Sequence, residues 1–99
     1  RSPNAANGLN ATHTTELPYV FYELHNFTQK DRYIAEIITK YWTSFAINGN
    51  PNSNEVPNWP QFNPNLTNTT LIIDNPTSYS SQFHQFYCDK WRNKWFIPQ

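Results

Sequence analysis

Between residues 28 and 49 the sequence repeats apolar residues with the period of an α-helix. Tyr33 starts a series with spacings of three and four residues, and its later members are Ile34, Ile37, Ile38, Tyr41, Trp42, Phe45 and Ala46. This spacing puts the apolar side chains on one stripe of a helix of about five turns. Thr28, with Asp31 three residues later, suits the helix start, whereas Gly49 and Pro51 suit its end. The pattern predicts a helix from about residue 29 to residue 47.

The segment before this helix contains a loop and a second, shorter helical pattern. Residues 1–12 hold Pro, Ser, Asn and Gly with few apolar residues, so we expect an irregular loop. A compact apolar segment, residues 16–22, follows Thr14 and Thr15, either of which can cap a short helix. Pro18 suits the first turn of such a helix, where no backbone donor is lost.

The segment after the long helix predicts one strand and one further helix. Residues 48–68 are rich in Asn and Pro and are expected to be a loop, whereas the β-branched run 69–73 predicts a short strand. A last helix is predicted over about residues 79–96 from the near-helical spacing of Phe83, Phe86, Tyr87, Trp91 and Trp95. Two amphipathic helices and one strand cover each other's apolar faces poorly. We therefore expect both helices to pack against a sheet outside this chain.

Composition narrows the class of protein. Ninety-nine residues make at most one small domain, and 7 basic residues balance 7 acidic ones. A net charge of zero disfavours binding to nucleic acid or to an anionic membrane surface, and the apolar runs are too short to span a bilayer. Aromatic residues reach 17%, a density that requires a packed core. So much aromatic surface in so short a chain indicates a piece of a larger domain.

Histidine is the side chain that most readily exchanges a proton near neutral pH. His13 lies in the predicted loop before the short helix, and spacing alone allows either a surface histidine or a catalytic base. His25 lies in a polar connector and is expected in solvent. His84 and Cys88 are four residues apart on the predicted last helix, so both can face one side. Two ligands do not complete a metal site, and we predict none here.

Four segments, taken in order, carry a family resemblance. Residues 10–21 read NATHTTELPYVF, residues 41–52 YWTSFAINGNPN, residues 59–62 WPQF and residues 88–91 CDKW. They resemble the catalytic-histidine segment, the GNPN turn, the following WP-aromatic segment and the terminal helix of type-B carboxylesterases and cholinesterases. The resemblance covers nearly all of residues 1–99. It implies an α/β fold in which the chain is the C-terminal segment of one α/β-hydrolase domain, with a histidine loop, two main helices and one short strand.

The resemblance also implies an activity. Members of this family are serine esterases that cleave carboxylic esters through an acyl-serine intermediate, without metal or cofactor. Their triad follows the chain order Ser, then Asp or Glu, then His, so the resemblance makes His13 the triad histidine, a general base and then a general acid. The chain contains no Gly-x-Ser-x-Gly, and its two glycines are Gly8 and Gly49. The nucleophile, the acid and the oxyanion-hole glycines are expected upstream, and the segment alone is expected to be inactive.

Glu16 and Asn10 lie three residues from His13 on either side. Glu16 is expected to support the histidine loop or to be a buried hydrogen-bond partner. The alternative is an ordinary first-turn acid that complements the helix dipole. Asn10 stands where the family usually has a glycine, three residues before the histidine. Asn is the next most tolerant residue for a positive φ, so this departure weakens the case for an active enzyme only slightly.

Glycosylation signals and one cysteine indicate a secreted, extracellular protein. Asn-x-Ser/Thr triplets begin at Asn26, Asn65, Asn68 and Asn10, with Asn10 the least favoured because it lies beside the catalytic base. Cys88 is the one cysteine, so it has no partner within the chain. The resemblance implies a disulfide to a cysteine upstream of this segment. The alternative is a buried free thiol.

Two rival functions remain open on the sequence. One is a catalytically inactive esterase-like adhesion or structural module, which keeps the fold but loses triad residues. Retention of His13 favours the enzyme, although one triad member of three does not decide the matter. The other rival is a free-standing aromatic-rich binding domain, which requires the chain to fold alone. For the enzyme, the expected partners are a small ester substrate and the remainder of the same esterase domain.

Overall fold

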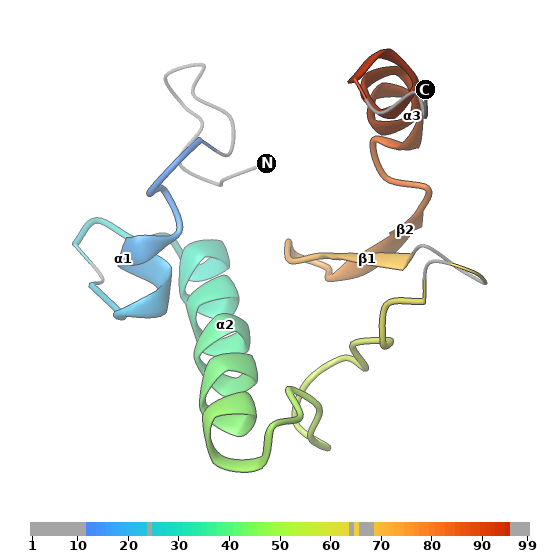
Figure 1. Cartoon of the computed structure of the whole chain (residues 1–99). Helices are drawn as coiled ribbons and strands as arrows, with labels where there is room; N and C mark the ends of the chain where they lie inside the picture. Colours follow the sequence, from blue (N-terminus) through green and yellow to red (C-terminus); the bar gives the residue numbers. More distant parts are fainter. Residues whose placement is uncertain (1–11, 24, 64, 66–68, 96–99) are drawn as a thin grey trace. The chain divides into compact units, whose positions relative to one another are not determined.

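The computed structural model describes residues 12–23, 25–63, 65 and 69–95. Their elements follow in the order α1 (Leu17–Val20), α2 (Gln29–Asn48), β1 (Thr69–Ile72), β2 (Ser78–Ser81) and α3 (Gln85–Trp95), as labelled in Figure 1. The chain divides into two compact units. The first comprises residues 1–59 and 72–78, and the second comprises residues 60–71 and 79–99.

The long helix α2 confirms the prediction at both ends. A capping box starts it: the Asp31 backbone N–H donates to Thr28 Oγ1 at 3.2 Å, and the Thr28 backbone N–H donates to Asp31 Oδ2 at 2.9 Å. Gly49 ends it in the left-handed conformation, with φ 68°, and its N–H donates to the Phe45 carbonyl at 2.8 Å. The local sequence therefore defines where this helix begins and where it ends.

The short helix α1 is a single turn, shorter than the apolar segment that predicted it. Pro18 lies in the first turn as expected. The expected threonine cap is wrong, because the N-cap is Glu16 and no side chain caps the helix. The Thr15 hydroxyl instead donates backwards to the Thr12 carbonyl at 2.7 Å, which closes a turn ahead of the helix.

The core of the first unit lies where α1 packs on α2. Figure 1 shows the two helices side by side. Tyr19 of α1 is buried with Ile34, Ala35 and Ile38 of α2, and four partly buried residues surround them: Val20, Phe27, Tyr33 and Ile73. The Phe27 ring lies 4.8 Å from the Tyr19 ring between centroids. The expectation that α2 needs a sheet outside this chain is therefore wrong for this face. The short helix, the loop before α2 and the loop after β1 cover it.

The last two turns of α2 differ from its first half. Trp42, Phe45 and Ile47 are large apolar side chains, yet they are 45%, 59% and 75% exposed. Within the residues that the structure describes, this end of the helix keeps an uncovered apolar surface. Here the prediction of a partner outside the chain still applies.

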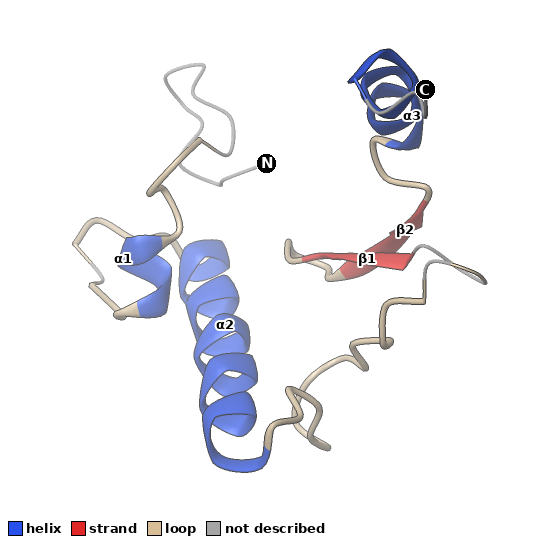
Figure 2. Cartoon of the chain, in the orientation of Figure 1, coloured by secondary structure: helices blue, strands red, loops and turns tan. Residues whose placement is uncertain are grey.

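The described residues in the second half of the chain form two strands, one more than the single short strand that was expected. β1 matches the predicted strand, but residues 78–81 form a second strand, β2, where the last helix was expected to start (Figure 2). The segment Ser-Tyr-Ser-Ser lacks the β-branched residues that mark a strand, and pairing with β1 stabilises it instead. The last helix begins only at Gln85. No helix among the described residues is long and apolar enough to cross a membrane.

Candidate functional site

His13 lies on a tight turn, residues 13–16, immediately before α1, and its side chain is exposed. The Thr15 backbone N–H and hydroxyl both donate to the Thr12 carbonyl, at 3.3 and 2.7 Å. Thr14 adopts a positive φ of 71°, and the Leu17 N–H donates to its carbonyl at 3.2 Å. These bonds enclose the backbone of His13 and join the turn to α1. The exposed imidazole therefore extends from a backbone that these hydrogen bonds hold in place.

Glu16 shares this turn and contributes through its backbone. Its carbonyl accepts hydrogen bonds from the Tyr19 and Val20 N–H groups at 2.9 and 3.0 Å, which form the single turn of α1. Its side chain is exposed and makes no capping hydrogen bond. Within this chain Glu16 is therefore not the buried hydrogen-bond partner that the sequence allowed.

Asp31, which the sequence indicated only as part of a helix start, is a buried carboxylate that also contacts α1. Asp31 is 0% exposed, and its Oδ1 accepts a hydrogen bond from the Tyr19 hydroxyl at 2.9 Å. Its Oδ2 accepts from the Thr28 backbone N–H at 2.9 Å and from the Thr28 hydroxyl at 2.6 Å. Burial by itself raises the pKa of Asp31, but the hydrogen bonds from Thr28 and Tyr19 outweigh burial and leave the pKa below its ordinary value. Asp31 is therefore ionised at neutral pH.

The sequence predicts the contact between Thr28 and Asp31 but not the contact between Asp31 and Tyr19. The spacing of Thr28 and Asp31 predicts the capping box, because three residues fix that geometry. The bond to Tyr19 spans twelve residues and depends on how α1 packs. The available signal was general: a tyrosine in an apolar segment usually finds a partner for its hydroxyl when it is buried.

The remaining histidines and the cysteine lie apart from the turn along the chain. His25 is exposed in the connector before α2, and His84 is exposed just before α3. The His84 ring contacts the Phe83 ring edge-on, with centroids 4.1 Å apart. Cys88 is an exposed free thiol one turn later, and its N–H donates to the His84 carbonyl at 3.0 Å. Across the described residues no three His, Cys, Asp or Glu side chains gather as a metal site requires.

The candidate glycosylation sites are only partly described. Asn26 is exposed in the turn before α2, and Asn65 is exposed in the second unit. Both side chains are accessible within this chain, as a sugar-bearing asparagine must be. Asn10 and Asn68 lie outside the described residues.

The loop after α2 is fastened to the helix by polar contacts. The Tyr41 hydroxyl donates to the Pro57 carbonyl at 2.6 Å. The Asn52 side chain bonds the backbone of Trp59 twice: its Nδ2 donates to the Trp59 carbonyl at 3.0 Å, and its Oδ1 accepts from the Trp59 N–H at 2.6 Å. The Ser44 hydroxyl donates to the Asn50 carbonyl at 2.9 Å. The loop therefore holds the Trp59 ring against the end of α2.

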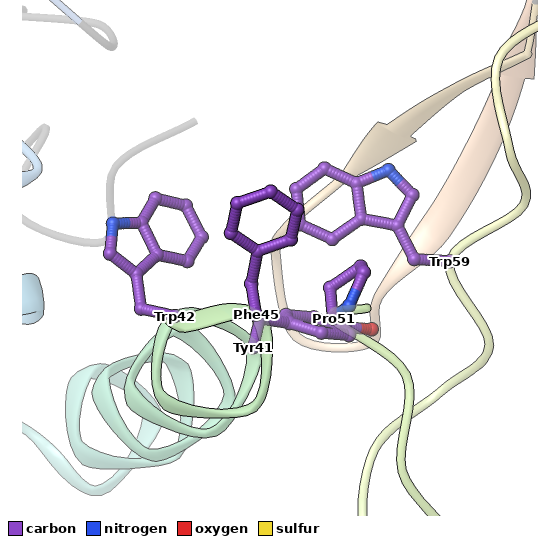
Figure 3. A pocket seen from close by; sticks show the side chains of 5 residues that line it. All are labelled: Tyr41, Trp42, Phe45, Pro51 and Trp59. Atoms are coloured by element: carbon purple, nitrogen blue, oxygen red, sulfur yellow. The ribbon is translucent and has the colours of Figure 1, made fainter. Parts of the chain in front are cut away.

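This arrangement leaves an apolar groove of about 310 Å³ at the end of α2, shown in Figure 3. The groove is lined by Tyr41, Trp42, Phe45, Pro51 and Trp59. The Trp59 ring meets the Tyr41 ring edge-on at 5.1 Å between centroids and tilts against Trp42 at 6.3 Å. Among the lining side chains, only Tyr41 carries a group that can exchange a proton. Its hydroxyl already donates to the Pro57 carbonyl. The groove offers apolar contact and no group that attacks an ester.

Comparison with known proteins gives a consistent result. A profile of the carboxylesterase family matches residues 2–91. The chain is 39% identical over 59 residues to cocaine esterase of Homo sapiens, which is 54% of this chain and 11% of that protein. It is 35% identical over 68 residues to the medium-chain fatty acyl-CoA hydrolase precursor of Anas platyrhynchos, which is 61% of this chain and 12% of that protein.

The solved structures agree with the sequence matches. A PNB esterase superposes with a TM-score of 0.70 at 30% identity, over 79% of this chain and 16% of the esterase. A thermophilic PNB esterase gives a TM-score of 0.71 at 29% identity, over 79% of this chain and 17% of that chain. The chain thus spans between a tenth and a fifth of these relatives, and its helices and small sheet form a part of their α/β-hydrolase fold. This chain belongs to the carboxylesterase family.

Proposed function

We propose that this chain is the C-terminal segment of a serine carboxylesterase and that it supplies the histidine of the catalytic triad. The observation that carries the proposal is the His13 turn: an exposed imidazole on a backbone that two threonine hydrogen bonds and α1 hold in place. A triad histidine needs both properties. It must reach groups from elsewhere in the domain, and it must not lose its orientation while a proton moves.

In the proposed reaction His13 takes the proton of the nucleophilic serine hydroxyl as its oxygen attacks the ester carbonyl. It then gives that proton to the departing alcohol oxygen, which leaves an acyl-serine. In the second half of the reaction His13 removes a proton from water, the hydroxide displaces the serine, and the proton returns to the serine oxygen. The serine, the triad acid and the oxyanion hole belong to the rest of the domain. The substrates are carboxylic esters as a class.

The partner of this chain is then the remainder of the same esterase domain. The exposed apolar side chains at the end of α2, Trp42, Phe45 and Ile47, support this pairing. Monomeric proteins rarely leave such patches uncovered, and the chain spans about a tenth of its curated relatives. Glu16, exposed on the turn of His13, is proposed to support that turn through contacts with the remainder of the domain.

We also propose a secreted, extracellular location. The exposed Asn26 and Asn65 fit glycan acceptors, and Asn68 and Asn10 complete the set of signals. The exposed Cys88 is accessible to a cysteine outside this chain. In an oxidising compartment that pair would close a disulfide between α3 and the segment upstream.

The test replaces His13 by Asn in the full-length protein and follows hydrolysis of p-nitrophenyl acetate. We expect kcat to fall by roughly 10³-fold or more, because triad members act as one unit. The matched controls are His25→Asn and His84→Asn, the same change at two other exposed histidines, which should keep kcat within a few-fold of the parent. A His13→Asn enzyme with near-normal kcat would reduce His13 to a bystander. The 99-residue chain alone should show no turnover above free imidazole at equal concentration.

A further inference from the structure

The buried Asp31 carboxylate joins α1 to α2 by a contact whose role is not explained by helix capping alone. Thr28, three residues before Asp31, occupies one carboxylate oxygen with two donors. The second oxygen accepts the hydroxyl of Tyr19, which lies on α1. Capping of α2 needs only the first oxygen. The bond to Tyr19 adds nothing to the cap at the start of α2, but it holds α1 in place.

Such a bond matters because α1 consists of residues 17–20 only. One helical turn does not hold its own shape or direction in water, so its orientation depends on what its side chains contact. Packing of the Tyr19 ring against Ile34 and Ile38 holds α1 close but allows it to slide, since apolar contact has no preferred direction. A hydrogen bond to an ionised acceptor is directional, and it removes that freedom.

The orientation of α1 is passed on to the histidine turn through the backbone. The Tyr19 N–H donates to the Glu16 carbonyl, and the Leu17 N–H donates to the Thr14 carbonyl, at 2.9 and 3.2 Å. His13 is the next residue before Thr14. A displacement of Tyr19 therefore moves the turn, and with it the imidazole.

We infer that the hydrogen bond between Tyr19 and Asp31 is a positioning contact that sets the place of the His13 imidazole. The inference rests on the proposed role of His13 in catalysis. Tyr19 and Asp31 touch neither substrate nor reacting atoms. They act through α1 and the turn of residues 13–16.

The experiment compares Tyr19→Phe with Tyr41→Phe in the full-length esterase. Each variant removes one hydroxyl from a buried tyrosine and leaves its ring in place. The Tyr41 hydroxyl bonds the Pro57 carbonyl, and Tyr41 lies ten residues beyond Asp31 along α2, roughly 15 Å away. Melting temperature, kcat and KM are measured for both variants and for His13→Asn.

We expect the melting temperatures of the two tyrosine variants to fall by similar amounts, but their activities to differ. Tyr19→Phe should lower kcat roughly 10- to 100-fold with KM within about twofold, because a misplaced base slows the chemical step and leaves binding intact. Tyr41→Phe should keep kcat within about twofold. Asp31→Asn keeps one acceptor oxygen and puts an NH2 donor in place of the other. It replaces Tyr19→Phe if that variant does not fold, and should show a smaller loss confined to kcat.

Each contrary outcome has its own meaning. If His13→Asn abolishes kcat while Tyr19→Phe and Tyr41→Phe keep the same kcat, the positioning contact is refuted and the proposed function stands. The positioning contact is also refuted if the loss in Tyr19→Phe or Asp31→Asn is divided between kcat and KM, which indicates general damage. If His13→Asn keeps kcat, the proposed function is refuted, and the positioning contact is refuted with it.

Discussion

Ile38→Ala in the 99-residue chain tests whether this segment has a core of its own. Ile38 is 7% exposed and belongs to the cluster formed by Tyr19, Ile34 and Ala35. The change removes three carbons, which at about 0.8 kcal/mol per buried methylene is roughly 2.4 kcal/mol. The cavity left between α1 and α2 adds to this, so we expect a loss of about 2 to 4 kcal/mol in the free energy of unfolding.

The assay is urea unfolding followed by circular dichroism of the helices and by tryptophan fluorescence, to which all four tryptophans of the chain contribute. The matched control is Ile47→Ala, the same change on the same helix at a side chain that is 75% exposed. Surface changes of this kind are worth about 0.5 kcal/mol or less. If the parent chain is only marginally stable, Ile38→Ala should abolish the cooperative transition, whereas Ile47→Ala should keep it.

Identical unfolding of the two variants would refute the expected core. Equal midpoints would mean that the contact between α1 and α2 does not form in the isolated chain. The expectation from the sequence, that α2 packs against a sheet outside this segment, would then hold for the whole helix. A large effect of Ile47→Ala alone would place the stabilising contact at the exposed end of α2.

Three further outcomes follow from single residues. Gly49→Ala should cost about 1 kcal/mol in urea unfolding, because Gly49 has φ 68° while an added Cβ meets no atom within 4 Å, so backbone strain is the whole cost. Asp31 has a folded-state pKa below its ordinary 3.8, so its contribution to stability is complete well above pH 3.8 and is lost as pH falls through the lowered pKa. Urea unfolding from about pH 6 to about pH 3 should therefore show a shallower acid-induced loss in Asp31→Asn than in the parent, and parallel curves would contradict the assignment. Cys88 should react with iodoacetamide at once in the native 99-residue chain, where it is exposed, but only after reduction in the denatured full-length protein. Labelling of the unreduced full-length protein would remove the proposed disulfide.

Local interactions made one element fully predictable. α2 depends on a 3.6-residue apolar period, a capping box closed over three residues and a glycine in the left-handed conformation, and each of these signals is local to its own part of the helix. β1 was likewise indicated by its β-branched run. His13 was singled out by family resemblance, since its loop spacing alone does not separate a catalytic histidine from a surface one.

Contacts between distant residues decided the rest. β2 has no strand pattern and exists because β1 offers it a backbone to pair with. The burial of Ile38 and the hydrogen bond from Tyr19 to Asp31 both depend on how α1 packs against α2. The apolar period of α2 does not predict that packing. Pattern in a sequence reports which side of an element avoids water. It does not report which partner covers that side, because the free energy of burial is nearly independent of the partner's identity, and only the packed chain selects one.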